Sequence, residues 1–305
     1  MADTILPGVL LDANVYRSRA GFDTLLDAEK RRGVARYADP FVVAELLAHL
    51  ADPADPHYAT CRGAIYRIHA RCNRGAGGEC GILQDSESRL AYLVTGSSLP
   101  KHDFFTERVI APLFADIALV PRDQPLPEPM QPHLQQIAAH VAEQKARFVE
   151  TARQLQATIQ AVQVSVDEQG KRETMKRARR THASEPTRRG IAEGYIRSAF
   201  TNAGLLAPDP LPPELVDRVY PRIATAVEFE ALIWEKLAFD GAKPESRGIQ
   251  SLRWDQRIAF NIGATSNGRP LWLVTDDHDF ARAAKAAGYS DRVLTRAVYE
   301  RWLAS

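Results

Sequence analysis

The chain has 305 residues, of which 45% are hydrophobic and 25% charged, and its 39 basic and 38 acidic side chains leave a formal net charge of +1. This apolar fraction is too high for a disordered chain and is ordinary for a globular one. No segment reaches the roughly 18–20 apolar residues of a membrane span, and the first residues lack the pattern of a signal peptide. We therefore expect a cytoplasmic globular protein with no membrane contact.

The first predicted elements are a buried strand and a capped helix. The apolar run Val9–Leu11 ends at the turn-forming Asp12, a pattern typical of a strand in a parallel sheet. Further along, Asp39 and Pro40 fit the N-cap and first position of a helix that ends before Pro53.

The next segment predicts helices, a second strand and a connector. Residues 57–113 have a helical pattern that is interrupted at the glycine-rich stretch 75–78. Ile117–Val120 is a short apolar run that predicts a second buried strand. Five prolines between residues 121 and 132 predict an extended connector.

Three cysteines lie in this segment, and two histidines lie near them. Their spacings lack the short C-x(2–4)-C unit of structural zinc sites, so we expect free thiols in a reducing compartment. The residues concerned are Cys61, Cys72 and Cys80, with His57 and His69.

A long helical pattern follows the connector. Its apolar residues recur at alternating gaps of three and four, close to a heptad seam, which predicts a helical hairpin or a coiled-coil arm. The seam comprises Leu134, Ile137, Val141, Phe148, Ala152, Leu155, Ile159, Val162 and Val166.

Residues 171–190 are strongly basic. Eight basic residues stand against Glu173 and Glu185, so this segment has a formal charge of +6 and the rest of the chain −5. Such a cluster predicts a clamp on nucleic-acid phosphates, although a solvated helix face has the same composition. No aromatic residue lies between 149 and 194, which favours phosphate contact over base stacking. The basic residues are Lys171, Arg172, Lys176, Arg177, Arg179, Arg180, Arg188 and Arg189.

The C-terminal part returns to an α/β pattern. Helices are predicted at 214–239 and 252–262, and a third buried strand at 270–275. Asp279 fits the N-cap of a short helix that Gly288 ends.

Acidic residues follow two of the predicted strands and interrupt two apolar helix faces. Asp12 and Asp277 follow strands, and the carboxyl ends of parallel strands form the usual binding crevice. Glu45 has apolar neighbours, and Asp255 shares a helix face with Ile258. A carboxylate on such a face costs several kcal/mol unless it is paired or bound to a metal.

Ordinary structural roles compete with a metal site. Aspartate is common in turns and at helix N-caps, which is the role we expect for Asp276 and an alternative for Asp279. For Asp255 the alternative is a buried ion pair with Arg253 or Arg257.

Taken as a set, four segments resemble the PIN-domain nucleases, which are metal-dependent ribonucleases. The run Ile117–Pro121 matches a further element of that family, and the resemblance covers about residues 5–125 and 226–305. The four segments are Leu10–Val15, Pro40–Leu46, Leu252–Ala259 and Leu273–Phe280.

The resemblance implies an α/β fold with three α/β/α layers and a central parallel sheet. Residues 1–127 and 226–305 would form the two parts of the PIN-like domain, and 128–225 a helical insertion that carries the basic segment. It further implies that Asp12, Glu45, Asp255 and Asp277 hold one or two Mg²⁺ or Mn²⁺ ions, helped by Asp279, with Asn14 and Thr275 orienting ligands or water.

The implied activity is hydrolysis of phosphodiester bonds, in RNA by analogy with the family, leaving 5′-phosphate and 3′-hydroxyl ends. Hard divalent cations held by carboxylates suit that reaction. Single-stranded DNA remains open as a substrate, as do a protein partner that inhibits or activates the enzyme and self-association through the insertion.

The family leaves several roles open. The chain is about twice as long as the short PIN toxins of toxin–antitoxin pairs, so RNA processing and defence are equally consistent with it. Two alternatives lie outside the nuclease hypothesis. One is a non-catalytic RNA-binding or scaffold protein on a PIN-like body. The other is a haloacid dehalogenase-type phosphohydrolase, which would need a second acid where Asn14 stands.

Overall fold

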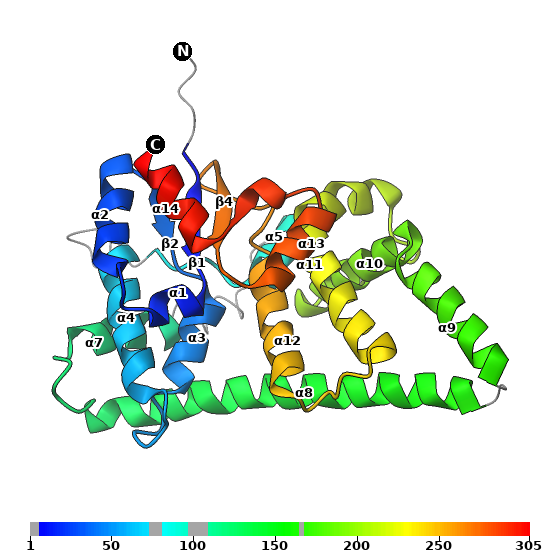
Figure 1. Cartoon of the computed structure of the whole chain (residues 1–305), viewed down its shortest axis with the longest axis horizontal. Coiled ribbons are helices and arrows are strands. Elements are labelled where there is room, and N and C mark those ends of the chain that lie inside the picture. The colour runs from blue at the N-terminus through cyan, green and yellow to red at the C-terminus, as the bar shows by residue number, and fades with distance from the viewer. Residues whose placement is uncertain (1–5, 73–80, 97–108, 165–167) are drawn as a thin grey trace, which may run out of the picture.

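A small five-stranded sheet lies within a mostly helical molecule (Figure 1). The computed structural model describes residues 6–72, 81–96, 109–164 and 168–305, without the side chains of 159–164 and 168–171. Its strands are β1 (Gly8–Leu11), β2 (Ala35–Tyr37), β3 (Thr265–Ser266), β4 (Arg269–Val274) and β5 (Val293–Leu294).

Strand β1 lies between β2 and β4 and is parallel to both. Its register with β4 places Gly8 beside Leu271 and Leu11 beside Val274. On the other edge of β4, β3 pairs antiparallel with its start and β5 parallel with its end. The predicted mixed α/β class with a parallel sheet is therefore confirmed, and the carboxyl ends of β1 and β4 meet at one edge.

Six helices are described in the first 120 residues, of which α4 packs against β2, α7 against α4, and α5 against α10 and α11. Asp39 caps α3 as predicted, because its side chain accepts hydrogen bonds from the backbone of Phe41 (2.7 Å) and Val42 (3.3 Å). These helices are α1 (Ala13–Arg17), α2 (Phe22–Arg32), α3 (Pro40–Ala48), α4 (Tyr58–Cys72), α5 (Ser86–Thr95) and α7 (Ala111–Leu119).

The strand predicted at 117–120 is wrong, because those residues form the last turn of α7 and its C-cap. The helix buries Leu113, Phe114 and Ile117 and leaves Leu119 75% exposed. A run of four apolar residues fits either kind of element, and here contact with α4 selects a helix.

Cys61 and Cys72 are buried, and neither forms a disulfide within the described residues, as expected. Cys80 and the glycine-rich break at 75–78 lie outside the described residues.

The remaining helices include the predicted insertion. None of the helices in the described part of the chain combines the length and apolar composition that a membrane span requires. The elements are a 3₁₀ turn η2 (Glu128–Met130), α8 (Gln131–Val164), α9 (Glu168–His182), α10 (Glu185–Asn202), α11 (Pro213–Phe239), α12 (Arg247–Ala259), α13 (His278–Ala286), η3 (Ser290–Arg292) and α14 (Arg296–Ala304).

The apolar seam of α8 faces the body of the protein. This helix runs beneath α3 and α12 (Figure 1), and Leu134, Ile137 and Val141 are buried in the common core. The prediction of a helical hairpin or coiled-coil arm is therefore wrong for the described part of the seam, because the seam packs against α3, α12 and the common core. Val166 and the side chains of Ile159 and Val162 lie outside the part of the chain that the structure describes.

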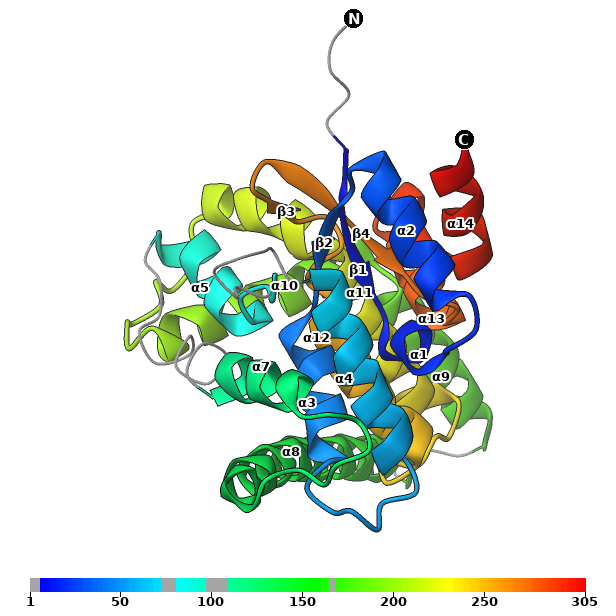
Figure 2. The ribbon, with the colours of Figure 1, turned by 90° about the vertical axis from the view of Figure 1, so that its left-hand side faces the viewer.

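The predicted segments share one hydrophobic core. The core cluster contains residues from 1–127, 128–225 and 226–305, and α11 runs without interruption through the predicted boundary at residue 225. The view from the side shows α10 packed beside α5 and α11 (Figure 2).

A fully buried ion pair connects the sheet to its surrounding helices. Arg71 donates to both carboxylate oxygens of Glu29, each at 2.8 Å, and to the backbone oxygens of Val9 and Tyr37, each at 3.0 Å. Tyr299 donates to the same carboxylate at 2.8 Å. The guanidinium group of Arg71 and the carboxylate of Glu29 thus together join α2, α4 and α14 to β1 and β2.

We expect Glu29→Gln to lower the free energy of unfolding by about 3–5 kcal/mol, because it leaves the Arg71 charge buried without its partner. Urea unfolding followed by circular dichroism measures this. The control is Glu143→Gln, which breaks an exposed pair with Arg147 and should cost less than about 0.5 kcal/mol. Equal losses in the two variants would contradict the prediction.

Candidate carboxylate site

Three residues at the carboxyl edge of the sheet are joined by hydrogen bonds. The buried Asp12 follows β1, and its carboxylate accepts from Ala13 N (2.6 Å) and from Thr275 Oγ1 (2.8 Å). The same Thr275 oxygen accepts from the backbone N–H of Asp277 (3.1 Å). Thr275 therefore fixes the acid after β1 against the turn after β4.

Asp277, and not Asp279, is the N-cap of α13. Its Oδ1 accepts from Asp279 N at 2.7 Å, so the predicted cap is wrong by two residues. Asp279 instead lies in the first turn, where its Oδ2 accepts from Lys236 Nζ at 2.8 Å. The cap position of Gly288 is confirmed, since it follows the C-cap with a φ of 80°.

Glu45 and Asp255 reach this edge from α3 and α12, two helices in contact with each other. Glu45 is half-buried and pairs with Arg17 at 3.2 Å. Within the described residues Asp255 makes neither a hydrogen bond nor an ion pair, while the two arginines beside it in sequence bind other acids. Arg253 binds Glu230 (2.6 Å), and Arg257 binds Glu87 (3.1 Å).

The alternative of an ion pair for Asp255 with Arg253 or Arg257 is therefore wrong. Both arginines project from α12 toward α5, α8 and α10, where they line a polar hollow with Tyr195. Asp255 is left on the side of α12 where the other carboxylates lie.

Electrostatic coupling shows that these acids form one group. Burial, together with the charges of Glu45 and Asp277, raises the pKa of Asp12 to about 6 against its two hydrogen bonds. Burial likewise holds the pKa of Asp255 well above its ordinary value. Four carboxylates raise that pKa further: Asp12, Asp277, Glu45 and Asp279.

The donor set fits a hard divalent cation in its chemistry. All its members are carboxylates, the ligands that Mg²⁺ and Mn²⁺ prefer, and Asp255 has no other counter-charge in the described structure. In that same part of the chain, no three His, Cys, Asp or Glu side chains are grouped closely enough to hold a metal ion as they stand. Glu45 and Asp279 are held by Arg17 and Lys236.

The other predicted residues take peripheral places. Asn14 is exposed on α1, and none of the described contacts joins its side chain to the acids. Asp276 is an exposed turn residue, as expected, and accepts from the backbone of Arg296 at 3.2 Å.

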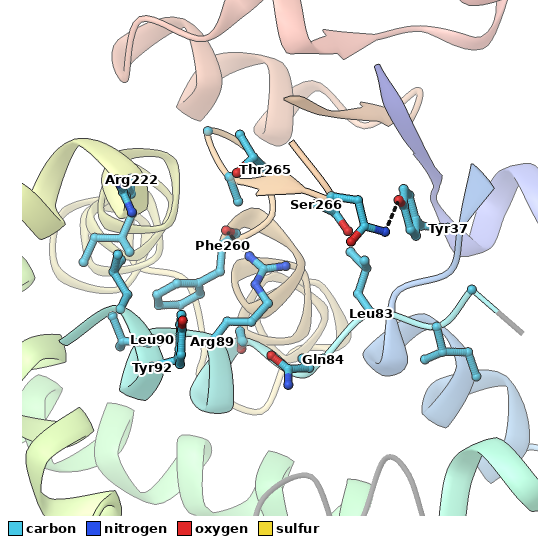
Figure 3. Close-up of a pocket in the computed structure, with 18 residues that line it drawn as sticks. Tyr37, Leu83, Gln84, Arg89, Leu90, Tyr92, Arg222, Phe260, Thr265 and Ser266 are labelled. Atoms are coloured by element: carbon cyan, nitrogen blue, oxygen red, sulfur yellow. Dashed lines mark hydrogen bonds between the residues drawn. The ribbon is translucent and has the colours of Figure 1, made fainter. Parts of the chain in front are cut away.

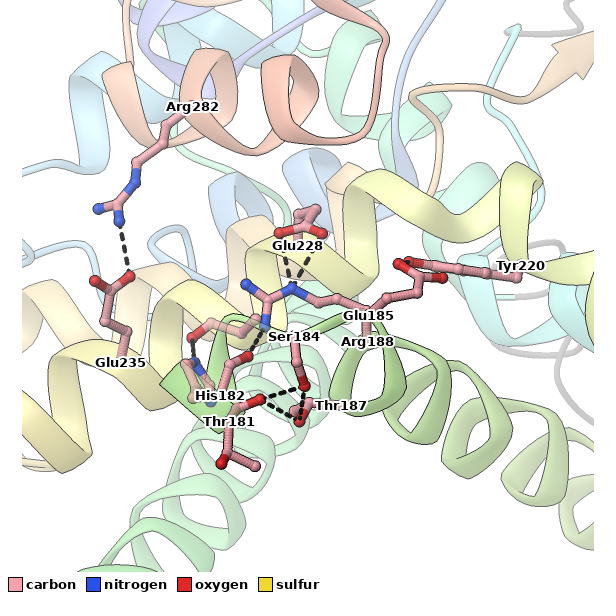
Figure 4. A network of polar contacts seen from close by, with 11 residues as sticks. Thr181, His182, Ser184, Glu185, Thr187, Arg188, Tyr220, Glu228, Glu235 and Arg282 are labelled. Carbon is pink, nitrogen blue, oxygen red and sulfur yellow. Dashed lines mark hydrogen bonds and ion pairs between the residues drawn. The ribbon is translucent and has the colours of Figure 1, made fainter. Parts of the chain in front are cut away.

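The predicted basic segment divides into two parts. Arg188 donates to both oxygens of Glu228, at 3.0 and 2.9 Å (Figure 4), and Arg189 pairs with Asp217 at 2.8 Å. These two therefore neutralise acids of α11. On α9, Arg172, Lys176, Arg177, Arg179 and Arg180 are all exposed. The side chain of Lys171 lies outside the description.

Helix α11 joins the basic face of α9 to the carboxylates. Arg179 donates to Phe239 O (3.1 Å) and Asp240 Oδ1 (3.4 Å) at the C-terminal end of α11. One turn earlier, Lys236 binds Asp279. A further ion pair, Arg282 with Glu235 (2.7 Å), fixes α13 on α11 beside this point (Figure 4). Of the exposed bases of α9, Arg179 thus lies about one turn of α11 from Lys236.

Sequence reasoning missed Arg17 and Lys236, the two basic residues that pair with Glu45 and Asp279. Neither lies in a recognisable motif, because Lys236 occupies an ordinary helical stretch and Arg17 ends the short α1. Only the folded arrangement brings them to Glu45 and Asp279.

No protein-family model, curated protein or solved structure matches this chain. The resemblance to PIN-domain nucleases therefore remains an expectation drawn from four short segments.

We expect Asp255→Asn to stabilise the metal-free protein by at least about 1 kcal/mol at pH 8, because it removes a charge from a repelling group. A raised folded-state pKa means that the ionised form destabilises the fold at high pH. The advantage of the variant should therefore shrink as the pH falls and vanish near pH 3, below the ordinary aspartate pKa of about 3.9, where this carboxyl is largely neutral in both states.

Urea unfolding in EDTA at the two pH values measures the difference. The matched control is Asp276→Asn, in the exposed turn of the same edge, which should change stability by less than about 0.5 kcal/mol. An unchanged or destabilised Asp255→Asn protein at pH 8 would show that the acids do not repel one another.

Proposed function

We propose that this protein is a Mg²⁺- or Mn²⁺-dependent nuclease whose active site is the carboxylate group at the sheet edge. The observation that carries the proposal is Asp255, a carboxylate with a raised pKa whose neighbours are other carboxylates and whose adjacent arginines bind elsewhere. Such an arrangement is costly in the absence of a cation and becomes favourable when one binds.

Asp12, Asp255 and Asp277 would hold the metal directly once their side chains move closer together around it, since none of them has a basic side chain in contact within the described structure. Glu45 would join them by exchanging Arg17 for the ion. Thr275 keeps Asp12 in one orientation through its hydroxyl. When bound, the ion supplies charge neutralisation for the scissile phosphate and lowers the pKa of an attacking water.

Lys236 brings a positive charge to the rim of the site, where it binds Asp279. Both side chains are about one quarter to one third exposed, so a substrate phosphate can reach the ammonium group. We assign Lys236 to substrate binding at the phosphate and Asp279 to holding it in place.

The exposed basic face of α9 would extend this contact along a nucleic-acid backbone. Its Arg179 contacts the end of α11 about one turn beyond Lys236, and the segment carries no aromatic residue, so we expect it to bind phosphates rather than bases. RNA is the substrate that the PIN resemblance implies, with single-stranded DNA the other candidate. The products would carry 5′-phosphate and 3′-hydroxyl ends.

A PIN-like three-layer arrangement is part of this proposal. Its support is the position of Asp12 and Asp277 after neighbouring parallel strands, with Glu45 and Asp255 on flanking helices. The residues 128–225 would then act as a substrate-binding addition to the nuclease body. Toxin, RNA-processing and defence roles all fit this chemistry.

The test is cleavage of a panel of labelled RNAs and single-stranded DNAs in Mn²⁺, Mg²⁺ or EDTA. We expect cutting that requires the metal and falls by about 100-fold or more in Asp12→Asn and Asp277→Asn, because each removes a charged ligand. The panel separates RNA from DNA.

Asp276→Asn is the control, since it changes an exposed acid of the same turn and should cut as well as the wild type. Circular dichroism confirms that each variant is folded. Tight, salt-sensitive binding without cutting, unaffected by Asp12→Asn, would instead indicate a non-catalytic RNA-binding protein.

The basic face of α9 gives a separate prediction. Changing Arg172, Arg177 and Arg180 together to Gln should weaken RNA binding and make log Kd less dependent on log salt, by about 0.7 for each phosphate that the protein no longer neutralises. Fluorescence anisotropy across a salt series measures both effects. The charge-matched control changes three exposed arginines elsewhere, Arg31, Arg247 and Arg301. Equal slopes in the two triple variants would exclude α9 as the clamp.

A further inference from the structure

A cavity of about 920 Å³ lies apart from the carboxylates. It is lined by α5, α11, the end of α12 and the segment 263–267, which contains β3 and leads into β4. Tyr37 of β2 lies on its far side (Figure 3). Segment 263–267 adjoins the start of β4, whereas Asp277 follows the end of β4. The cavity and Asp277 therefore lie toward opposite ends of this strand. Its size is that of a typical small-molecule site.

The lining of this cavity is positively charged. It includes Arg89 and Arg222, and none of the described residues that line it is acidic. Arg222 is exposed and has no hydrogen bond or ion pair in the described structure. Arg89 donates to Phe260 O at 2.9 Å and to Asn261 Oδ1, which are neutral acceptors. An anion in this cavity would therefore meet two guanidinium groups that no acid contacts directly.

The electrostatic surroundings of Arg89 agree with this arrangement. Burial lowers its pKa, and Asp39 and Asp85 counteract that only from beyond ion-pair distance. A guanidinium group held in place by neutral acceptors remains available to an incoming anion and suits an oxyanion such as a phosphate.

Aromatic and neutral polar side chains complete the cavity. Phe260 and Tyr92 gather at one end with Arg222, and Arg89 lies between them and Tyr37 (Figure 3). Tyr92 is 59% exposed, so its ring is accessible to a ligand. The hydrogen-bonding groups are those of Gln84, Thr265, Ser266 and Asn267.

We propose that this cavity binds a nucleoside phosphate. Two guanidinium groups accept the phosphate, an exposed tyrosine and a phenylalanine offer faces for a base, and amide and hydroxyl groups can pair with its edge. An apolar ligand would leave both charges unpaired, and inorganic phosphate would fill only a small part of the space.

The cavity is connected to the helices that carry two of the acids. Asn261, which accepts from Arg89, donates through its amide to Asp39, the N-cap of α3. Glu45 lies on α3, and Phe260 is the C-cap of α12, which carries Asp255. A phosphate drawn to Arg89 would thus act on both helices. The binding proposal itself does not depend on the nuclease activity.

Isothermal titration calorimetry of the full chain with AMP, in EDTA, tests the site without involving the carboxylates. We expect saturable binding of AMP, weaker binding of adenosine and of inorganic phosphate, and a loss of about 10-fold or more in AMP affinity for Arg222→Gln and for Tyr92→Ala. Both side chains are exposed, so these variants should fold.

Arg247→Gln, which removes an exposed arginine at the other end of α12, is the matched control and should bind AMP as the wild type does. Asp12→Asn should also bind AMP normally, whatever its effect on cleavage. Absence of AMP binding, or unchanged affinity in both cavity variants, would overturn the proposal.

The nucleotide can be free or part of a bound strand, and a competition experiment separates these sources. If a short 5′-phosphorylated RNA displaces AMP, the cavity receives a nucleotide of the substrate. If AMP and the RNA bind together, the cavity is a separate site for a free nucleotide. Either result supports the assigned ligand chemistry.

Discussion

The parallel pairing of β1 with β4 is the constraint on which the rest of the structure depends. It joins residues near the two ends of the chain, and the hydrogen bond from Thr275 to Asp12 then crosses a sequence separation of 263 residues. Both strands are largely buried, so their register is fixed by packing on both faces. Without this pairing there would be no common edge for the acids, and α3 and α12 would have no fixed position relative to it.

The distribution of counter-charges gives this edge its character. Arg71, Arg253 and Arg257 all bind acids elsewhere, at distances of 2.6–3.1 Å. Among the described residues, the basic side chains that pair with acids at the sheet edge are Arg17 with Glu45 and Lys236 with Asp279. Burial and mutual repulsion consequently raise the pKa values of the inner acids Asp12 and Asp255. This is the physical basis for proposing a bound cation, because an unpaired buried charge is otherwise destabilising.

The helical segment 128–225, which has no counterpart in the PIN-domain family, contributes to the same hydrophobic core as the rest of the chain. The seam of α8 supports α3 and α12 from below, and α11 contributes Lys236 to the site while it receives Arg179 and Arg188 from the basic segment. A basic region that looks independent in the sequence is therefore fixed relative to the acids. The cavity between α5 and α11 arises from the same packing.

Features that rest on local interactions could be predicted from the amino-acid sequence. These are the strands before Asp12 and Asp277, the Asp39 cap and the acids at the strand ends, since strand pattern and capping depend on a few adjacent residues. Only the tertiary structure decided that residues 117–120 form a helix, which acids the bases near Asp255 bind, and what covers the α8 seam. Each of these depends on partners far away in the chain, and no local pattern specifies such partners.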